Sequence, residues 1–140
     1  MSSTQDATPT PFELIGGEDR VRALVDRFYD LMDREPSYAA IRALHPADLA
    51  DSRDKLFWFL CGWLGGTQHY VERFGHPQLR ARHLPFPIGI RERDQWVECM
   101  GRAMDGAGVA PDLKARLSAS LMQTADWMRN RAENAAGPAA

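Results

Sequence analysis

The sequence predicts an all-α fold, and three observations lead to this prediction. In four separate stretches the apolar residues recur at intervals of three and four, which places them on one face of a helix. Alternation of apolar and polar residues, as a half-buried strand requires, never persists. Prolines and the pairs Gly16-Gly17 and Gly65-Gly66 separate the four stretches. We therefore expect four substantial helices joined by shorter elements.

The first long helix is expected to follow Gly17, after a short segment at residues 12–15, and to run for about sixteen residues. Its apolar face turns the ring of Tyr29 inward and contains Val21, Leu24, Val25, Phe28, Tyr29 and Met32. Pro36 ends this helix, because proline cannot continue it without losing a backbone hydrogen bond. A short helical piece then leads to His45-Pro46.

The second long helix begins near Asp48 or Asp51, either of which can cap it. Its apolar face contains Leu56, Phe59, Leu60, Trp63 and Leu64. Gly65-Gly66 ends the helix, and residues 67–74 are expected to form a connection. Two further long helices start after Gly89 and at Pro111. Their apolar faces contain Trp96, Cys99, Met100, Ala103 and Met104, and then Leu113, Leu117, Leu121, Ala125 and Met128.

The stretch at residues 75–89 is too rich in proline for a long helix. Pro77 suits a first helical position and two later prolines stop the helix, so about two turns remain, with His83 at their end. Arg80 and Arg82 lie beside His83, within apolar surroundings. This combination suits a haem, which needs an axial nitrogen, an apolar slot and cations for its propionates. Taken alone, a histidine near a helix end is more commonly a surface or hydrogen-bonded residue.

Length and composition favour one domain. The 140 residues, of which 44% are hydrophobic, can bury a single core. We expect a disordered tail at 1–10, a domain at 11–130 and a loose tail at 131–140. A net charge of -2 without basic runs argues against nucleic acid, and the absence of a long apolar run or a signal peptide favours a cytoplasmic protein without a membrane segment. Cys61 and Cys99 are expected to be buried thiols.

The chain carries a series of short motifs in order: Arg27-Phe28-Tyr29, Leu44-His45-Pro46, Trp63-Leu64-Gly65-Gly66, Gly75-His76-Pro77, Arg82-His83, Phe86 and Glu92-Arg93-Asp94-Gln95-Trp96. In order and spacing these motifs resemble the truncated haemoglobins, and most closely their group II. The resemblance covers residues 12–128. It implies a globin-like two-over-two sandwich of helices that encloses haem b. Because no Cys-x-x-Cys-His motif occurs, the haem would be held non-covalently.

The resemblance also implies a role for each matching residue. His83 would be the proximal iron ligand, and Tyr29, His45 and Trp96 would be polar distal groups. All three distal side chains are expected to donate hydrogen bonds to a polarised ligand. Ser52 would take the distal position where many globins hold a histidine.

The remaining haem contacts that the resemblance implies are peripheral. Lys55 and Arg82 would pair with the propionates, although exposed charges at helix ends commonly only face water. The apolar contacts would come from Leu56, Phe59, Leu79, Phe86 and Ile88.

Other interpretations of the same residues stay open without the resemblance. Tyr29 and Trp96 could simply fill the core, and His45 could be a loop residue. A seven-residue spacing relates His69, His76 and His83, which would allow a zinc site. The breaks at 75 and 77 disfavour the helix that such a site would need, so we expect His69 at the surface and His76 at the start of the short helix.

The function that follows is reversible binding of O2, NO and CO at a five-coordinate haem iron, with peroxide, cyanide and azide as further ligands. Tight retention of O2 would suit NO dioxygenase or peroxidase-like chemistry and would require an unidentified electron donor. One alternative is an oxygen sensor or delivery protein that acts with a partner. Another is a helical domain that has lost its cofactor. A monomer or weak homodimer is expected.

Overall fold

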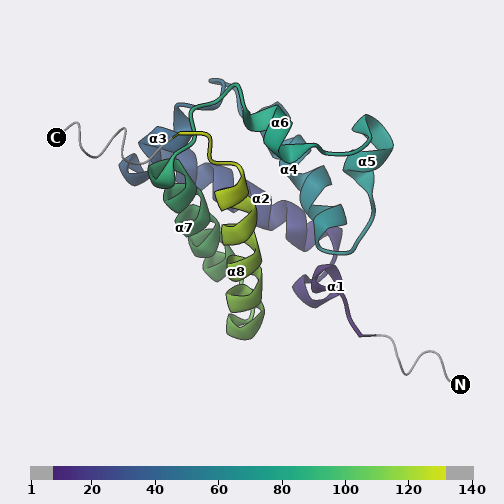
Figure 1. Cartoon of the computed structure of the whole chain (residues 1–140). Helices are drawn as coiled ribbons and strands as arrows, with labels where there is room; N and C mark the ends of the chain where they lie inside the picture. Colours follow the sequence, from purple (N-terminus) through teal and green to yellow (C-terminus); the bar gives the residue numbers. More distant parts are fainter. Residues whose placement is uncertain (1–7, 132–140) are drawn as a thin grey trace, which may run out of the picture.

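The computed structural model describes residues 8–131, and within this range the regular elements are all helical (Figure 1). The elements are α1 (Pro11–Ile15), α2 (Glu18–Arg34), η2 (Pro36–Tyr38), α3 (Ala39–Arg42), α4 (Ala50–Trp63), α5 (His69–Phe74), α6 (Leu79–His83), α7 (Ile90–Gly106) and α8 (Pro111–Trp127). The predicted all-α fold is therefore confirmed. The expected tails lie almost wholly outside the described residues.

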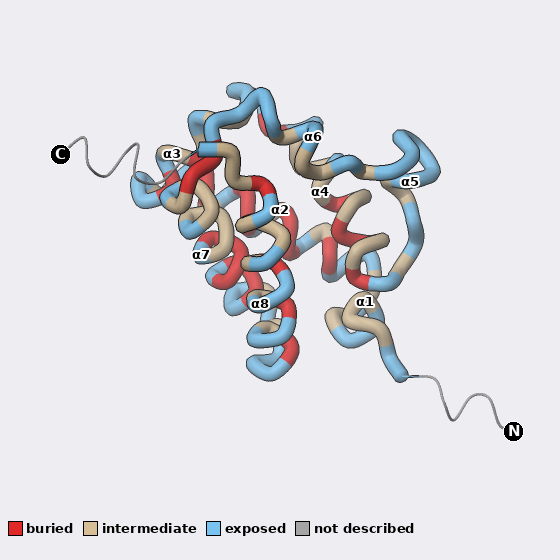
Figure 2. The backbone as a smooth tube through the Cα atoms, viewed as in Figure 1, coloured by how far each residue is buried: buried red, intermediate tan, exposed pale blue. Residues whose placement is uncertain are grey.

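Four long helices form the body of the molecule. Helix α2 packs against both α4 and α7, and α7 packs in turn against α8 (Figure 1). Figure 2 shows the buried residues gathered along these helices. The six apolar residues that the spacing placed on the inner face of α2 are all buried. Both cysteines, Cys61 and Cys99, are also buried, as expected.

The first helices end where the sequence predicts. Helix α2 stops at Arg34, and Glu35 adopts an extended conformation with φ -93° and ψ 120°. A residue before proline avoids the helical region because the proline ring would collide with it, and Pro36 follows Glu35.

Among residues 8–131, no helix combines the length and the apolar composition that crossing a bilayer demands.

The pair Gly65-Gly66 brings the end of α4 close to α1. Phe12 N–H donates to the Leu64 carbonyl over 2.9 Å, which joins the two helices. A Cβ atom on Gly66 would lie 2.5 Å from the Phe12 ring, so only glycine fits there without a shift. Gly65 has φ +97°, a conformation that favours glycine. The pair thus ends the helix, as predicted, and also makes room for α1.

Three expectations about element boundaries were wrong. Residues 67–74 contain α5 and are not a plain connection. The short helix that ends at His83 has five residues, fewer than the expected two turns, and it begins at Leu79. Pro77 lies before this helix, because Gln78 adopts a left-handed conformation with φ 48° that separates the proline from α6.

The start of α4 also differs from the expectation. Leu49 is the N-cap residue and no side chain caps it. Asp48 accepts a hydrogen bond from Ala50 N–H over 2.9 Å, whereas Asp51 lies inside the first turn. The apolar residues of α4 occupy more than one face: Phe57, Leu60, Cys61 and Leu64 enter the core, while Leu56, Phe59 and Trp63 face a cavity.

Candidate functional site

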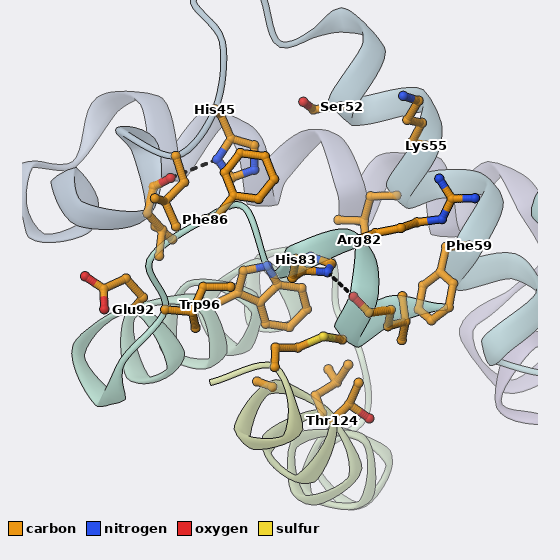
Figure 3. Close-up of a pocket in the computed structure, with 18 of the residues that line it drawn as sticks. His45, Ser52, Lys55, Phe59, Arg82, His83, Phe86, Glu92, Trp96 and Thr124 are labelled. Atoms are coloured by element: carbon orange, nitrogen blue, oxygen red, sulfur yellow. Dashed lines mark hydrogen bonds between the residues drawn. The ribbon is translucent and has the colours of Figure 1, made fainter. Parts of the chain in front are cut away.

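A cavity of about 520 Å³ opens between the long helices and the α6 segment (Figure 3). Its volume lies within the range of about 300–1,000 Å³ that is typical of pockets for bound small molecules. Every residue that the sequence analysis placed at the site lines this one cavity: Tyr29, His45, Ser52, Lys55, Leu56, Phe59, Leu79, Arg82, His83, Phe86, Ile88 and Trp96. The structure therefore brings all the predicted site residues together.

One ring nitrogen of His83, Nε2, has no hydrogen-bond partner within residues 8–131. The residue ends α6 and is half-buried. Its Nδ1 lies 2.7 Å from the Leu79 carbonyl oxygen, as the dashed line in Figure 3 shows. A carbonyl can only accept, so Nδ1 carries the proton and Nε2 keeps its lone pair. This is the arrangement that metal-binding histidines adopt, in which the second ring nitrogen is fixed by a backbone or carboxylate acceptor.

Tyr29 places a buried hydroxyl at the cavity without a protein partner. Only 4% of the residue is exposed, and its ring packs edge-on against Phe28 at 5.0 Å and His45 at 5.7 Å between centroids. Within residues 8–131 no hydrogen-bond partner reaches the hydroxyl. Burial raises the pKa of Tyr29, an effect that the nearby Arg53 charge only partly opposes. The hydroxyl is therefore a proton donor at any physiological pH.

Trp96 adds a second donor on the same cavity. It lies on α7, and its ring centroid is 5.1 Å from that of Phe28. No acceptor among the described residues lies within hydrogen-bond distance of the indole N–H, and Figure 3 shows the indole beside His83 in the pocket. A half-buried indole usually finds a partner for its N–H, so a ligand in the cavity is the natural acceptor.

His45 differs from the expectation that it would donate. Its Nδ1 lies 2.8 Å from the Ile41 carbonyl oxygen, so the proton of the neutral ring is on Nδ1. Burial lowers the pKa of His45, the hydrogen bond to the Ile41 carbonyl only partly opposes this effect, and the charge of Arg42 lowers the pKa further. The ring is thus neutral near pH 7, and its Nε2 is an acceptor. At this cavity Tyr29 and Trp96 therefore offer hydrogen-bond donors, whereas His45 offers an acceptor.

Two cations stand at the mouth of the cavity. Figure 3 shows Lys55 and Arg82 on the same side of the pocket, with Ser52 on the turn of α4 before Lys55. Lys55 makes an exposed ion pair with Asp51 at 3.1 Å, which is weak and exchangeable. Arg82 donates through Nε to the Pro77 carbonyl at 2.8 Å and has no carboxylate partner among the described residues. Both can therefore meet an anionic group at the rim.

Several lining residues were not predicted as part of the site. Leu121, Ala125 and Met128 were assigned to the core, yet they line the cavity from α8 and its end. Tyr70 was missed because α5 itself was missed, and Thr124 because a lone threonine on a helix carries no signal of its own. The apolar face of α8 both packs against α7 and lines the cavity. An apolar face serving two contacts would have indicated Leu121, Ala125 and Met128.

The other two histidines have partners elsewhere. His69 was expected at the surface but is half-buried, and its Nε2 lies 2.7 Å from Glu18. His76 was expected at the start of the short helix but lies before it, where its Nδ1 accepts a hydrogen bond from Gln78 N–H over 3.0 Å. In the described part of the chain, no three His, Cys, Asp or Glu side chains are placed to share a metal ion. The zinc interpretation therefore has no support in the geometry.

The residues of the cavity fit a haem. The walls are largely apolar, the imidazoles of His83 and His45 each keep an Nε2 without a partner among residues 8–131, and cations stand at the rim. The buried Tyr29 hydroxyl has no partner within residues 8–131, and a buried polar group without a partner is costly unless a ligand satisfies it. Haem bound here would meet His83 as its axial ligand and Lys55 and Arg82 near its propionates.

Comparison with known proteins identifies the family. The model of the bacterial-like globin family matches residues 10–130. The chain belongs to this family, in the group II truncated haemoglobins. It is 42% identical to the group 2 truncated hemoglobin YjbI of Bacillus subtilis over 123 residues, which are 88% of this chain and 90% of that protein.

Solved structures of related globins superpose on the whole domain. The group II 2-on-2 hemoglobin of Agrobacterium tumefaciens is 47% identical, with a TM-score of 0.87, covering 94% of this chain and all of that one. A truncated oxygen-avid haemoglobin from Bacillus subtilis is 40% identical, with a TM-score of 0.79 and coverage of 87% and 100%. The predicted two-over-two fold and the family resemblance are both confirmed. The protein is thus a haem-based ligand-binding globin.

Proposed function

We propose that this truncated haemoglobin holds haem b non-covalently through His83, binds O2, NO and CO, and retains O2 tightly. The observation that carries the proposal is the pair of donors at one cavity, the Tyr29 hydroxyl and the Trp96 indole N–H, neither of which has a partner among the described residues. The oxygen-avid character stated for the Bacillus subtilis relative supports the same conclusion.

Haem held by His83 supplies an iron with one coordination position open to a diatomic molecule. The residues of this chain decide how long such a molecule stays. Tyr29 and Trp96 donate toward a ligand that carries partial negative charge, and the apolar walls keep water from competing. A hydrogen bond to a charged group contributes about 1.5–3 kcal/mol, and a factor of ten in rate corresponds to about 1.4 kcal/mol. Each donor therefore slows O2 release about tenfold to about a hundredfold.

Slow release suits chemistry on the ligand better than delivery. Oxidation of NO to nitrate and turnover of peroxide are the two reactions that a pocket with fixed donors favours, because the donors stabilise charge that develops on the ligand. Either role requires an electron donor that returns the iron to its ferrous state. CO, which is less polarised, gains less from Tyr29 and Trp96.

The experiment is stopped-flow measurement of O2 release from the reduced, haem-loaded protein. Trp96→Phe keeps an aromatic ring and removes the indole N–H, so release should be about tenfold to about a hundredfold faster. Trp58→Phe is the matched control, because Trp58 lies on α4 against Phe74, outside the cavity, and should leave the rate unchanged. Unchanged release in Trp96→Phe would refute its donor role. Fast release from the unaltered protein would favour oxygen delivery or sensing with a partner.

A further inference from the structure

The segment that carries His83 has little apolar packing to hold it. Helix α6 has five residues and none of them is buried. After it, Leu84 and Phe86 are 52% and 40% exposed. Figure 2 shows this part of the chain as exposed and intermediate, in contrast to the long helices. Apart from the cavity side, where Leu79 and Phe86 would contact the haem, polar contacts tie its backbone to the end of α8.

Asn130, just beyond the end of α8, provides these contacts. Its Oδ1 accepts from Ile88 N–H at 2.9 Å, and its Nδ2 donates to the carbonyls of Phe86 at 2.8 Å and His83 at 3.3 Å. Its own backbone N–H donates to the Ile88 carbonyl at 2.8 Å. One side chain thus satisfies three backbone groups spread over residues 83–88. The His83 carbonyl also accepts from Phe86 N–H at 3.0 Å, so Asn130 adds a second hydrogen bond there and links that turn to the end of α8.

Arg80 makes a second connection between α6 and the same end of α8. Its Nη1 donates to the Trp127 carbonyl and, at 2.9 Å, to the Arg129 carbonyl. Arg80 lies in the middle of α6, whereas Asn130 reaches the carbonyl of His83 itself. Of Arg80 and Asn130, it is Asn130 that bonds the backbone on both sides of the turn after α6, at His83 and at Ile88.

We propose that Asn130 is a positioning residue that sets the direction in which His83 presents Nε2 to the haem iron. The inference rests on the proposed role of His83 as proximal ligand. The His83 ring is tied to Leu79 of its own helix, so the ring turns with the α6 backbone. Whatever fixes that backbone relative to α8 therefore fixes the ring. A loosened segment would give a spread of ring orientations and a weaker hold on the haem.

Two substitutions separate the parts of this contact. Asn130→Ala removes the three side-chain hydrogen bonds to residues 83–88. Asn130→Asp keeps an acceptor for Ile88 N–H but loses the donor to the carbonyls of His83 and Phe86. Gln68→Ala is the matched control, since it deletes an amide that donates to the Gly62 carbonyl at 3.2 Å, at the start of α5 and outside the main cavity.

Three readouts are taken on the haem-loaded protein: hydrogen exchange at Ile88 N–H, the iron–histidine stretching band of the reduced protein in resonance Raman spectra, and the rate of haem transfer to an acceptor globin. Asn130→Ala should speed exchange at Ile88 and haem loss, each about tenfold, and should shift or broaden the band. Asn130→Asp should change the band while Ile88 stays protected. Gln68→Ala should leave all three unchanged.

The outcomes separate this proposal from the one it rests on. A band of unaltered position and width in Asn130→Ala, even with faster exchange at Ile88, would show a merely structural contact and overturn the inference. An unchanged band in Asn130→Asp would overturn the part assigned to the Nδ2 donor. If His83→Gly retains the band of the unaltered protein, the ligand assignment itself is wrong. Loss of the band in His83→Gly with a shifted band in Asn130→Ala supports both.

Discussion

Replacing Tyr29 by phenylalanine tests the distal pocket most directly, because the change removes one hydroxyl and little else. The ring is 4% exposed and packed edge-on against Phe28, so a phenylalanine occupies the same space. The raised pKa keeps the hydroxyl protonated, hence a donor, and within residues 8–131 nothing else accepts its proton. The full free energy of the hydrogen bond from the Tyr29 hydroxyl is therefore available to a polarised ligand. At about 1.5–3 kcal/mol, its loss should speed O2 release about tenfold to about a hundredfold.

The assay is stopped-flow absorbance of the reduced protein, with CO release as the internal control. CO carries less charge than O2 in the same pocket, so its release should change less than about threefold. The competing acceptor is Nε2 of His45, whose ring centroid lies 5.7 Å from that of Tyr29. If the hydroxyl turns to His45 in the loaded protein, Tyr29→Phe leaves O2 release unchanged, and the reasoning is refuted.

Two further predictions concern stability. Gly66→Ala should lower the free energy of unfolding by about 1–3 kcal/mol in urea titrations, because the new Cβ would collide with the Phe12 ring, whereas Gly101→Ala, in ordinary contact inside α7, should not destabilise. Hydrogen bonds from two arginines hold the pKa of Asp126 below its usual 3.8. Its carboxylate therefore stabilises the fold above about pH 4, and this contribution is lost as the pH falls through the lower folded-state pKa. The stability difference between the unaltered protein and Asp126→Asn should accordingly shrink below about pH 4.

The long helices could be predicted from the sequence because their apolar faces repeat at helical spacing. All six inward residues of α2 are buried. The stop at Pro36 follows from the covalent geometry of proline, and the stop at Gly65-Gly66 from the freedom of glycine to adopt a positive φ. Helix α5 was missed for the opposite reason. It is six residues long and buries none of them, so no apolar face marked it. The start of α6 was misplaced because Gln78 adopts a left-handed conformation, which is uncommon for a residue other than glycine and has no signal in the sequence.

The candidate site was predictable in its members but not in its hydrogen bonds. Motif order alone indicated every cavity residue that the resemblance named, including His83 and Trp96. The tautomer of His45 was not predictable, because it depends on the Ile41 carbonyl one helical turn away. The contacts of Asn130 were not predictable either, because Asn130 follows the last apolar face and bonds to residues more than forty positions earlier in the chain.

The bond from His83 to the Leu79 carbonyl also has an electronic consequence. A carboxylate acceptor would draw the Nδ1 proton toward itself and make the imidazole electron-rich, whereas a neutral carbonyl does so far less. An electron-rich axial ligand favours cleavage of an O–O bond. With His83 as the proposed axial ligand, the chain would supply little such drive, while Tyr29 and Trp96 would supply donors that hold a polarised ligand. Of the two proposed reactions, this asymmetry favours oxidation of NO over turnover of peroxide.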